Sequence, residues 1–114
     1  MTGVQTCALP IYEAYLTALS NGLATTFAAI KPELVIYLAG ADPFEGDRLG
    51  RLKITKAGLA TRDRMVFGAC ADANAALAIV MAGGYANNIQ DTVDIHVATL
   101  VQAAHWKRSG RQLS

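Results

Sequence analysis

The chain has 114 residues, which is enough for one small domain with a single hydrophobic core. Its formal net charge is +1, and no block of like charge suggests an acidic or basic tail that would bind nucleic acid. Since no uninterrupted apolar run reaches the roughly 18 residues of a membrane span, neither nucleic acid nor a membrane is an expected partner.

Residues 1–11 have neither a helical nor a strand period, so the fold prediction begins at Tyr12. Residues 4–11 read VQTCALPI, which resembles the in-frame translation of a common sequencing adapter. We therefore expect residues 1–11 to be an artefact joined to a natural chain, of bacterial source, that continues upstream. The alternative is a short natural N-terminal arm.

The first predicted elements are a helix and a strand. The helix covers residues 12–30, because apolar side chains recur there at spacings of three and four. Pro32 ends it, since the residue before a proline is displaced from helical geometry. Residues 33–39 form a short apolar run without alternation, which is typical of a strand buried on both faces of a parallel sheet. A polar loop with three glycines, residues 40–50, follows.

The second half repeats this order. Thr55 can cap a helix that carries Leu59, Arg62, Met65, Val66 and Ala69 at helical spacing. Residues 76–81 form a second buried strand, which ends at two glycines. A last helix is predicted over residues 88–106, with a buried face made of Ile89, Val93, His96, Val97, Leu100 and Val101. This is a βαβ unit with flanking helices, which predicts an α/β fold with a parallel sheet.

Two loops follow the predicted strands and should meet at the carboxyl edge of the sheet, where functional groups gather in α/β folds. Asp42 in the first loop is either a metal ligand or a cap that bonds nearby backbone amides. In the second loop, Gly83 and Gly84 allow a close backbone approach and place the phenol of Tyr85 at the sheet edge. On spacing alone, Asp42 is better interpreted as a capping carboxylate and Tyr85 as a half-buried aromatic ring.

Taken together, the two loops resemble the late metal-ligand loop of the zinc-dependent histone deacetylases. The similarity runs from residues 34–42 (LVIYLAGAD) through residues 45–50 (EGDRLG) to Gly-Gly-Tyr at residues 83–85, and it covers about residues 31–97. Asp-Arg-Leu-Gly followed by Thr-x-x-Gly-Leu is typical of the bacterial and class IV branch. The resemblance implies the C-terminal βαβ portion of an arginase/deacetylase-type fold, with residues 12–114 a partial histone deacetylase-like domain.

The resemblance also implies roles for individual residues. Asp42 would be the last of three protein ligands of a catalytic zinc. Tyr85 would hydrogen-bond the acyl carbonyl and its tetrahedral oxyanion, while Leu49, Gly83 and Gly84 would line the channel that admits the acyl chain. The implied reaction is hydrolysis of the amide of acetyl-lysine, an acylated polyamine or a similar acylated amine.

The same resemblance indicates what the chain lacks. The other two zinc ligands of the family form an Asp-x-His pair upstream, and no such pair precedes Asp42 here. Of the two histidines, His96 is expected in the core and His105 on the surface. Because a lone carboxylate holds zinc weakly, we expect zinc only in the intact parent and an inactive chain here. Asp47-Arg48 would be a structural pair that supports the loop.

Other function classes have less support. A small non-enzymatic α/β module that binds a partner through its sheet edge is the main alternative, and it requires Met1 to be a true start. A nucleotide-binding domain would need Gly-x-Gly-x-x-Gly or a P-loop lysine, and neither occurs. A serine or cysteine hydrolase lacks Gly-x-Ser-x-Gly, and Cys70 lies within a predicted helix. Cys7 and Cys70 have no metal-type spacing and predict reduced thiols in a cytoplasmic protein.

Overall fold

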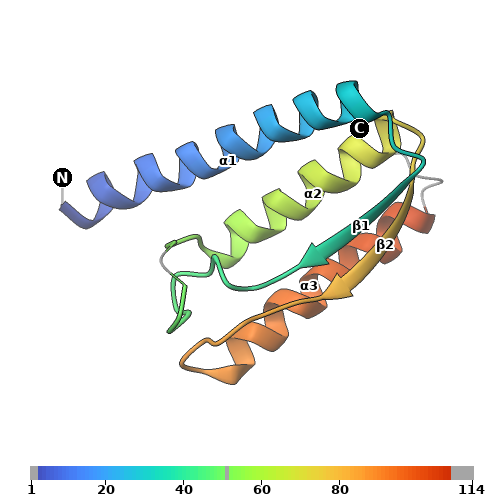
Figure 1. Cartoon of the computed structure of the whole chain (residues 1–114). Coiled ribbons are helices and arrows are strands. Elements are labelled where there is room, and N and C mark those ends of the chain that lie inside the picture. The colour runs from blue at the N-terminus through green and yellow to red at the C-terminus, as the bar shows by residue number, and fades with distance from the viewer. Residues whose placement is uncertain (1–2, 51, 109–114) are drawn as a thin grey trace.

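The structure is a computed structural model of the chain that describes residues 3–50 and 52–108, with side chains for residues 12–50 and 52–107. Its elements in chain order are α1 (Gly3–Ile30), β1 (Leu34–Ala39), α2 (Lys56–Asp72), β2 (Ala76–Met81) and α3 (Ile89–Arg108). Figure 1 shows α1 running alongside α2, and the strands β1 and β2 lying side by side. The predicted α/β fold is confirmed.

The strands β1 and β2 pair in parallel, with Leu34 opposite Ala76 and Ala39 opposite Met81. Parallel neighbours need a crossover connection, and α2 supplies it. The βαβ unit is therefore present as predicted. The strand β2 has its predicted bounds, and β1 begins one residue later than predicted, at Leu34.

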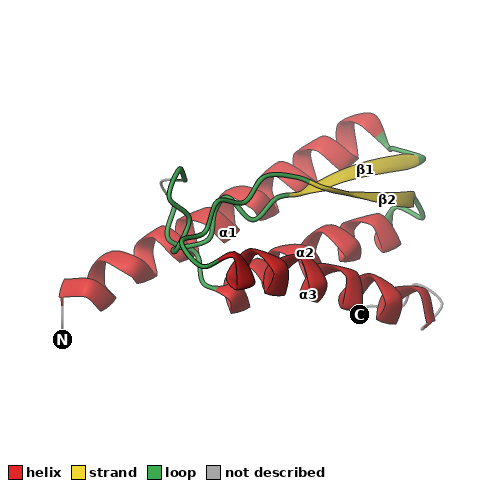
Figure 2. Ribbon diagram, turned by 90° about the horizontal axis from the view of Figure 1, so that it is seen from below, coloured by secondary structure: helices red, strands yellow, loops and turns green. Residues whose placement is uncertain are grey.

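All three helices contribute to the core beneath one face of the sheet. Figure 2 shows α2 and α3 together on one side of the strands. The inner face packs against a buried cluster of Val66, Phe67, Cys70 and Trp106, to which Leu23 and Phe27 of α1 also belong as partly buried neighbours. The outer face is bare, because Leu34, Ile36 and Leu38 are 58%, 59% and 64% exposed. The prediction that the strands are buried on both faces is therefore wrong for the described chain.

The helix α1 begins at Gly3, before the expected start at Tyr12. The helix includes Pro10, although a proline inside a helix lacks the N–H for one intrahelical hydrogen bond. At the other end, Lys31 takes a positive φ of 52° and its N–H bonds the carbonyl of Phe27 before Pro32 stops the helix. The adapter origin of residues 1–11 stays a prediction.

Thr55 caps α2 as predicted, since its hydroxyl accepts a hydrogen bond from the N–H of Gly58 at 3.0 Å. Gly58 itself is needed for packing. A Cβ at this position would lie 2.6 Å from Ile54 and 2.7 Å from the ring of Tyr12. The start of α2 is thereby brought close to α1 and to a second buried cluster, which consists of Ala41, Phe44, Ile54, Leu59 and Ile95.

The helix α3 turns a different face to the core from the predicted one. Of the residues predicted to be buried, Ile89 is 78% exposed and Val93, Val97, Leu100 and Val101 are 44–51% exposed. The buried residues are instead Ile95, Thr99 and Trp106. Thr99 faces inward because its hydroxyl donates to the buried carboxylate of Asp63, and Trp106 stacks on Phe67 with ring centroids 5.9 Å apart. These two contacts set the rotation of α3, which apolar spacing alone does not reveal.

The two histidines of α3 differ in environment. His105 is exposed, as expected, and His96 is partly buried. The Nε2 atom of His96 has no hydrogen-bond partner among the described residues, so the expected satisfied core histidine is not what is found. In the part of the chain that the structure describes, no helix combines the length and apolar character needed to cross a bilayer.

Candidate functional site

The loops after β1 and β2 meet at the carboxyl edge of the sheet, as predicted (Figure 1). They are joined along their length by backbone hydrogen bonds, from Ala41 N to Gly83 O (2.7 Å), Arg48 N to Tyr85 O (2.9 Å) and Asn87 N to Gly46 O (3.1 Å). The first loop donates two of these bonds and the second loop donates one, so the two segments form one hydrogen-bonded unit. The candidate residues Asp42 and Tyr85 lie in this unit, one on each loop.

The side chain of Asp42 lies against the glycines of the second loop. A Cβ at Gly83 would come within 2.7 and 2.8 Å of the two carboxylate oxygens of Asp42, so any larger residue there would displace that carboxylate. Asp42 is exposed, and no described residue donates a hydrogen bond to its carboxylate. A capping aspartate would bond nearby amides, so the capping interpretation of Asp42 has no support among the described residues.

The capping role belongs to Asp47 instead. Its Oδ1 accepts hydrogen bonds from the amides of Leu49 (2.8 Å) and Gly50 (2.7 Å), and its Oδ2 accepts one from the amide of Tyr85 (2.7 Å). One carboxylate, only 8% exposed, therefore holds both loops. Burial alone would raise the pKa of Asp47, but the amides of Tyr85, Gly50 and Leu49 outweigh it and lower that pKa below its ordinary value.

The substitution Asp47→Asn should destabilise the chain by about 2 kcal/mol at neutral pH, because a side-chain N–H₂ would face the amide of Tyr85. The folded pKa lies below the ordinary value of 3.8, so this stabilisation is complete above that value and is lost as the pH falls through the folded pKa. Urea unfolding at pH 7 and at about pH 3 measures both effects. Glu45→Gln, an exposed change in the same loop, is the control, and equal losses in the two variants would contradict the assignment.

Tyr85 is held by its main chain and leaves its ring accessible. Its amide bonds Asp47, and its carbonyl accepts from the backbone N–H of Arg48, with the Nε of Arg48 at 3.4 Å. The side chain is 50% exposed, and that of Leu49 is 70% exposed. The predicted structural role of Asp47 and Arg48 fits these contacts. They support the segment that carries Tyr85.

Gly84 serves a different contact from Gly83. A Cβ at Gly84 would lie 2.7 Å from the methyl group of Thr92 and 3.1 Å from the Cβ of Ala41. Glycine at this position therefore allows the start of α3 to approach the first loop. The two predicted glycines thus position the loops relative to the carboxylate of Asp42 and to α3.

A buried polar network beneath the first loop was not predicted as a functional feature. Asp63, 1% exposed, accepts hydrogen bonds from the hydroxyl groups of Tyr37 and Thr99 and from Nε and Nη2 of Arg62. Burial raises the pKa of Tyr37 well above its usual range, so the phenol stays protonated and donates. The sequence feature that could have indicated this network is the pair Arg62-Asp63, which lies on the otherwise apolar face of the predicted second helix.

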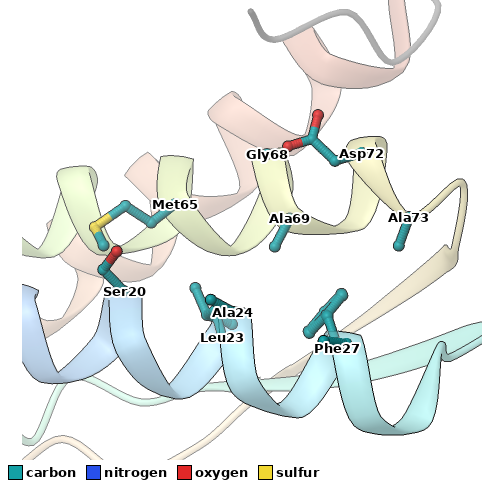
Figure 3. Close-up of a pocket in the computed structure, with 10 residues that line it drawn as sticks. Ser20, Leu23, Ala24, Phe27, Met65, Gly68, Ala69, Asp72 and Ala73 are labelled. Atoms are coloured by element: carbon teal, nitrogen blue, oxygen red, sulfur yellow. The ribbon is translucent and has the colours of Figure 1, made fainter.

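The hollows on the described surface include two that differ in their relation to the loops. One, of about 370 Å³, opens beneath the first loop and is lined by Asp42, Tyr37 and Arg62 together with Tyr15, Leu19, Leu38, Gly40, Pro43, Val66 and Ala82. The other, of about 550 Å³, lies between α1 and α2 (Figure 3) and is lined by side chains such as Phe27, Met65 and Asp72. The larger hollow contains no residue of either loop, so only the smaller one is part of the candidate site.

The described residues do not form a complete metal site. Among them, no group of three or more His, Cys, Asp or Glu side chains is placed to hold a metal ion. Asp94 and His96 have Asp-x-His spacing, although they follow Tyr85 and lie in α3. The carboxylate of Asp94 bonds Lys56 at 2.9 Å and Gln90 at 2.8 Å, and residues two apart on a helix do not face each other. They are therefore not a ligand pair for a metal at Asp42.

Known proteins resemble this chain along most of its length. The sequence model of the family described as "Histone deacetylase domain" matches residues 10–100. An uncharacterized protein of Picosynechococcus sp. is 44% identical over 84 residues, which are 74% of this chain and 28% of that protein. Histone deacetylase 2 of Arabidopsis thaliana is 41% identical over 73 residues, or 64% of this chain and 19% of that protein. The chain thus spans less than a third of the length of either relative.

Proposed function

Because the chain belongs to the histone deacetylase family, we propose that it supplies one side of a catalytic site that hydrolyses acylated amines. The substrate class is an acetylated or otherwise acylated lysine or polyamine, cleaved at its amide. One observation carries the proposal: a carboxylate and a phenol, on adjoining loops at the carboxyl edge of a parallel sheet, are both exposed. Asp42 has no other hydrogen-bonding task among the described residues.

Within this proposal, the residues of the two loops have separate tasks. The phenol of Tyr85 donates a hydrogen bond to the carbonyl oxygen of the scissile amide as negative charge develops on it. The exposed side chain of Leu49 provides an apolar wall for the acyl chain, and Gly83 leaves room for the carboxylate of Asp42. Asp47 keeps Tyr85 in place through its amide.

A catalytic zinc does not fit this chain by itself. Such a centre needs three protein ligands, commonly including imidazoles, and the described residues offer the carboxylate of Asp42 without a second ligand pair. We propose that Asp42 becomes a ligand only beside residues that another part of the family's domain supplies. The purified chain, loaded with zinc and then dialysed, should retain much less than one zinc per molecule by elemental analysis. Retention of one zinc per chain, lost in Asp42→Ala, would contradict this.

The function itself is tested by a chimera. The matching 73-residue segment of Arabidopsis Histone deacetylase 2 is replaced by the corresponding segment of this chain. We expect release of acetate from an acetyl-lysine peptide or an acetylated polyamine, and we expect Asp42→Ala to abolish it. Glu45→Gln is the matched control, because it removes an exposed carboxylate from the same loop. A folded chimera without turnover on either substrate, or one indifferent to Asp42→Ala, would overturn the proposal.

A further inference from the structure

A buried arginine reaches the backbone directly before Asp42. The Nη1 atom of Arg62 donates a hydrogen bond of 2.6 Å to the carbonyl oxygen of Gly40, which is the first residue after β1. The next N–H along the chain, that of Ala41, donates to the carbonyl of Gly83 at 2.7 Å. These two groups belong to one peptide unit. The peptide between Gly40 and Ala41 is thus held at its oxygen by α2 and at its nitrogen by the second loop.

This double attachment determines the direction of the chain at Asp42. A peptide group is planar, so fixing both its C=O and its N–H fixes the orientation of the plane. Gly40 has no side chain and could otherwise adopt many backbone conformations. The residue that follows the fixed plane is Ala41, and Asp42 comes next.

Arg62 is itself rigid. Its side chain is 6% exposed, and its Nε and Nη2 atoms lie 3.1 and 3.0 Å from Oδ1 of Asp63. The ring of Tyr37 lies beneath the guanidinium at 5.6 Å, and Tyr37 also donates to Asp63. A planar guanidinium with donors on both sides cannot turn without breaking several of these contacts. The donor that reaches Gly40 therefore has one position.

We propose that Arg62 is a positioning residue that orients the Asp42 carboxylate by clamping the Gly40–Ala41 peptide. This inference rests on the proposed function, in which Asp42 is the residue that must be oriented. Asp63 and the ring of Tyr37 act through Arg62 by holding its guanidinium. Lysine cannot take its place, because a single ammonium group lacks the fork that serves Gly40 and Asp63 at once.

The test is amide hydrogen exchange of the full 114-residue chain, followed residue by residue by NMR. In Arg62→Met the amide of Ala41 should exchange at least about tenfold faster relative to the amides of β2, as expected for the loss of one hydrogen bond to a charged group. Arg62→Lys should restore the overall stability in part while Ala41 still exchanges fast. If Arg62→Met does not fold, the exchange rate of the Ala41 amide in Arg62→Lys alone tests the proposal.

Thr99→Val is the matched control. It removes one hydrogen bond to Asp63 without touching the bond to Gly40, so Ala41 and β2 should speed up by the same factor. An equal acceleration of Ala41 and β2 in both Arg62 variants, or no change at Ala41, would overturn the proposal. The exchange readout needs no catalysis. An inactive chimera would therefore end the proposed function, and the exchange result would still decide whether Arg62 clamps the loop.

Discussion

Replacing Asp63 by leucine should destabilise the chain by about 3–5 kcal/mol, because the guanidinium of Arg62 would stay buried without its counter-charge. Arg62 is 6% exposed and Asp63 is 1% exposed, so water cannot replace the lost partner. The hydroxyl groups of Tyr37 and Thr99 lose their acceptor in the same step. Urea unfolding followed by circular dichroism measures the change.

A double variant tests whether the unpaired charge of Arg62 causes this loss of stability. Arg62→Met combined with Asp63→Leu removes both charges, and it should recover a large part of the stability lost in Asp63→Leu, since apolar residues often replace a buried ion pair at little cost. Asp72→Ala, an exposed change at the end of α2, serves as the reference. If Asp63→Leu loses no more free energy of unfolding than Asp72→Ala, the network around Asp63 does not stabilise the chain by the expected amount.

Removing one hydroxyl group, in Tyr85→Phe, should lower kcat of the chimera by about 10²–10³-fold, the usual effect of deleting an oxyanion donor. Stability should be unchanged, because the ring is 50% exposed and the hydrogen bonds of Tyr85 described above involve its main chain. Steady-state kinetics and urea unfolding on the same preparation measure the two quantities.

Glu45→Gln is the control for this change, because it alters an exposed side chain of the first loop that has no part in the proposed reaction. The control should keep the kcat of the parent chimera. If Tyr85→Phe also keeps it, the phenol has no part in the reaction, and the proposed role of Tyr85 fails even if Asp42 proves essential.

The features that could be predicted from the sequence are those with local causes. A run such as residues 76–81, which two glycines follow shortly, identifies a strand without knowledge of its neighbours. Thr55 identifies a helix start because its hydroxyl bonds an amide one turn away. The meeting of the two loops follows from parallel pairing alone. Within the site, Asp42 and Tyr85 were named only through the resemblance of their two loops to those of the family.

The features that escaped prediction depend on partners far along the chain. The inward face of α3 is set by the bond between Thr99 and Asp63, and a threonine among valines gives no sign of it. The network around Arg62 was missed because a charged pair on a helix is usually solvated. Asp42 and Asp47 look alike in the sequence, and only the amides around Asp47 show which of them is the cap.

The register of the sheet has a consequence for the order in which this chain can fold. Each pair joins residues 42 positions apart, from Leu34 with Ala76 to Ala39 with Met81. On the ribosome, β1 therefore cannot pair with β2 until α2 has emerged and β2 follows it. Helical contacts within α1 and α2 are local and form early, whereas the strand pairing must close a long loop first and is slow. During that interval the apolar strand β1 is a surface on which a chaperone can act.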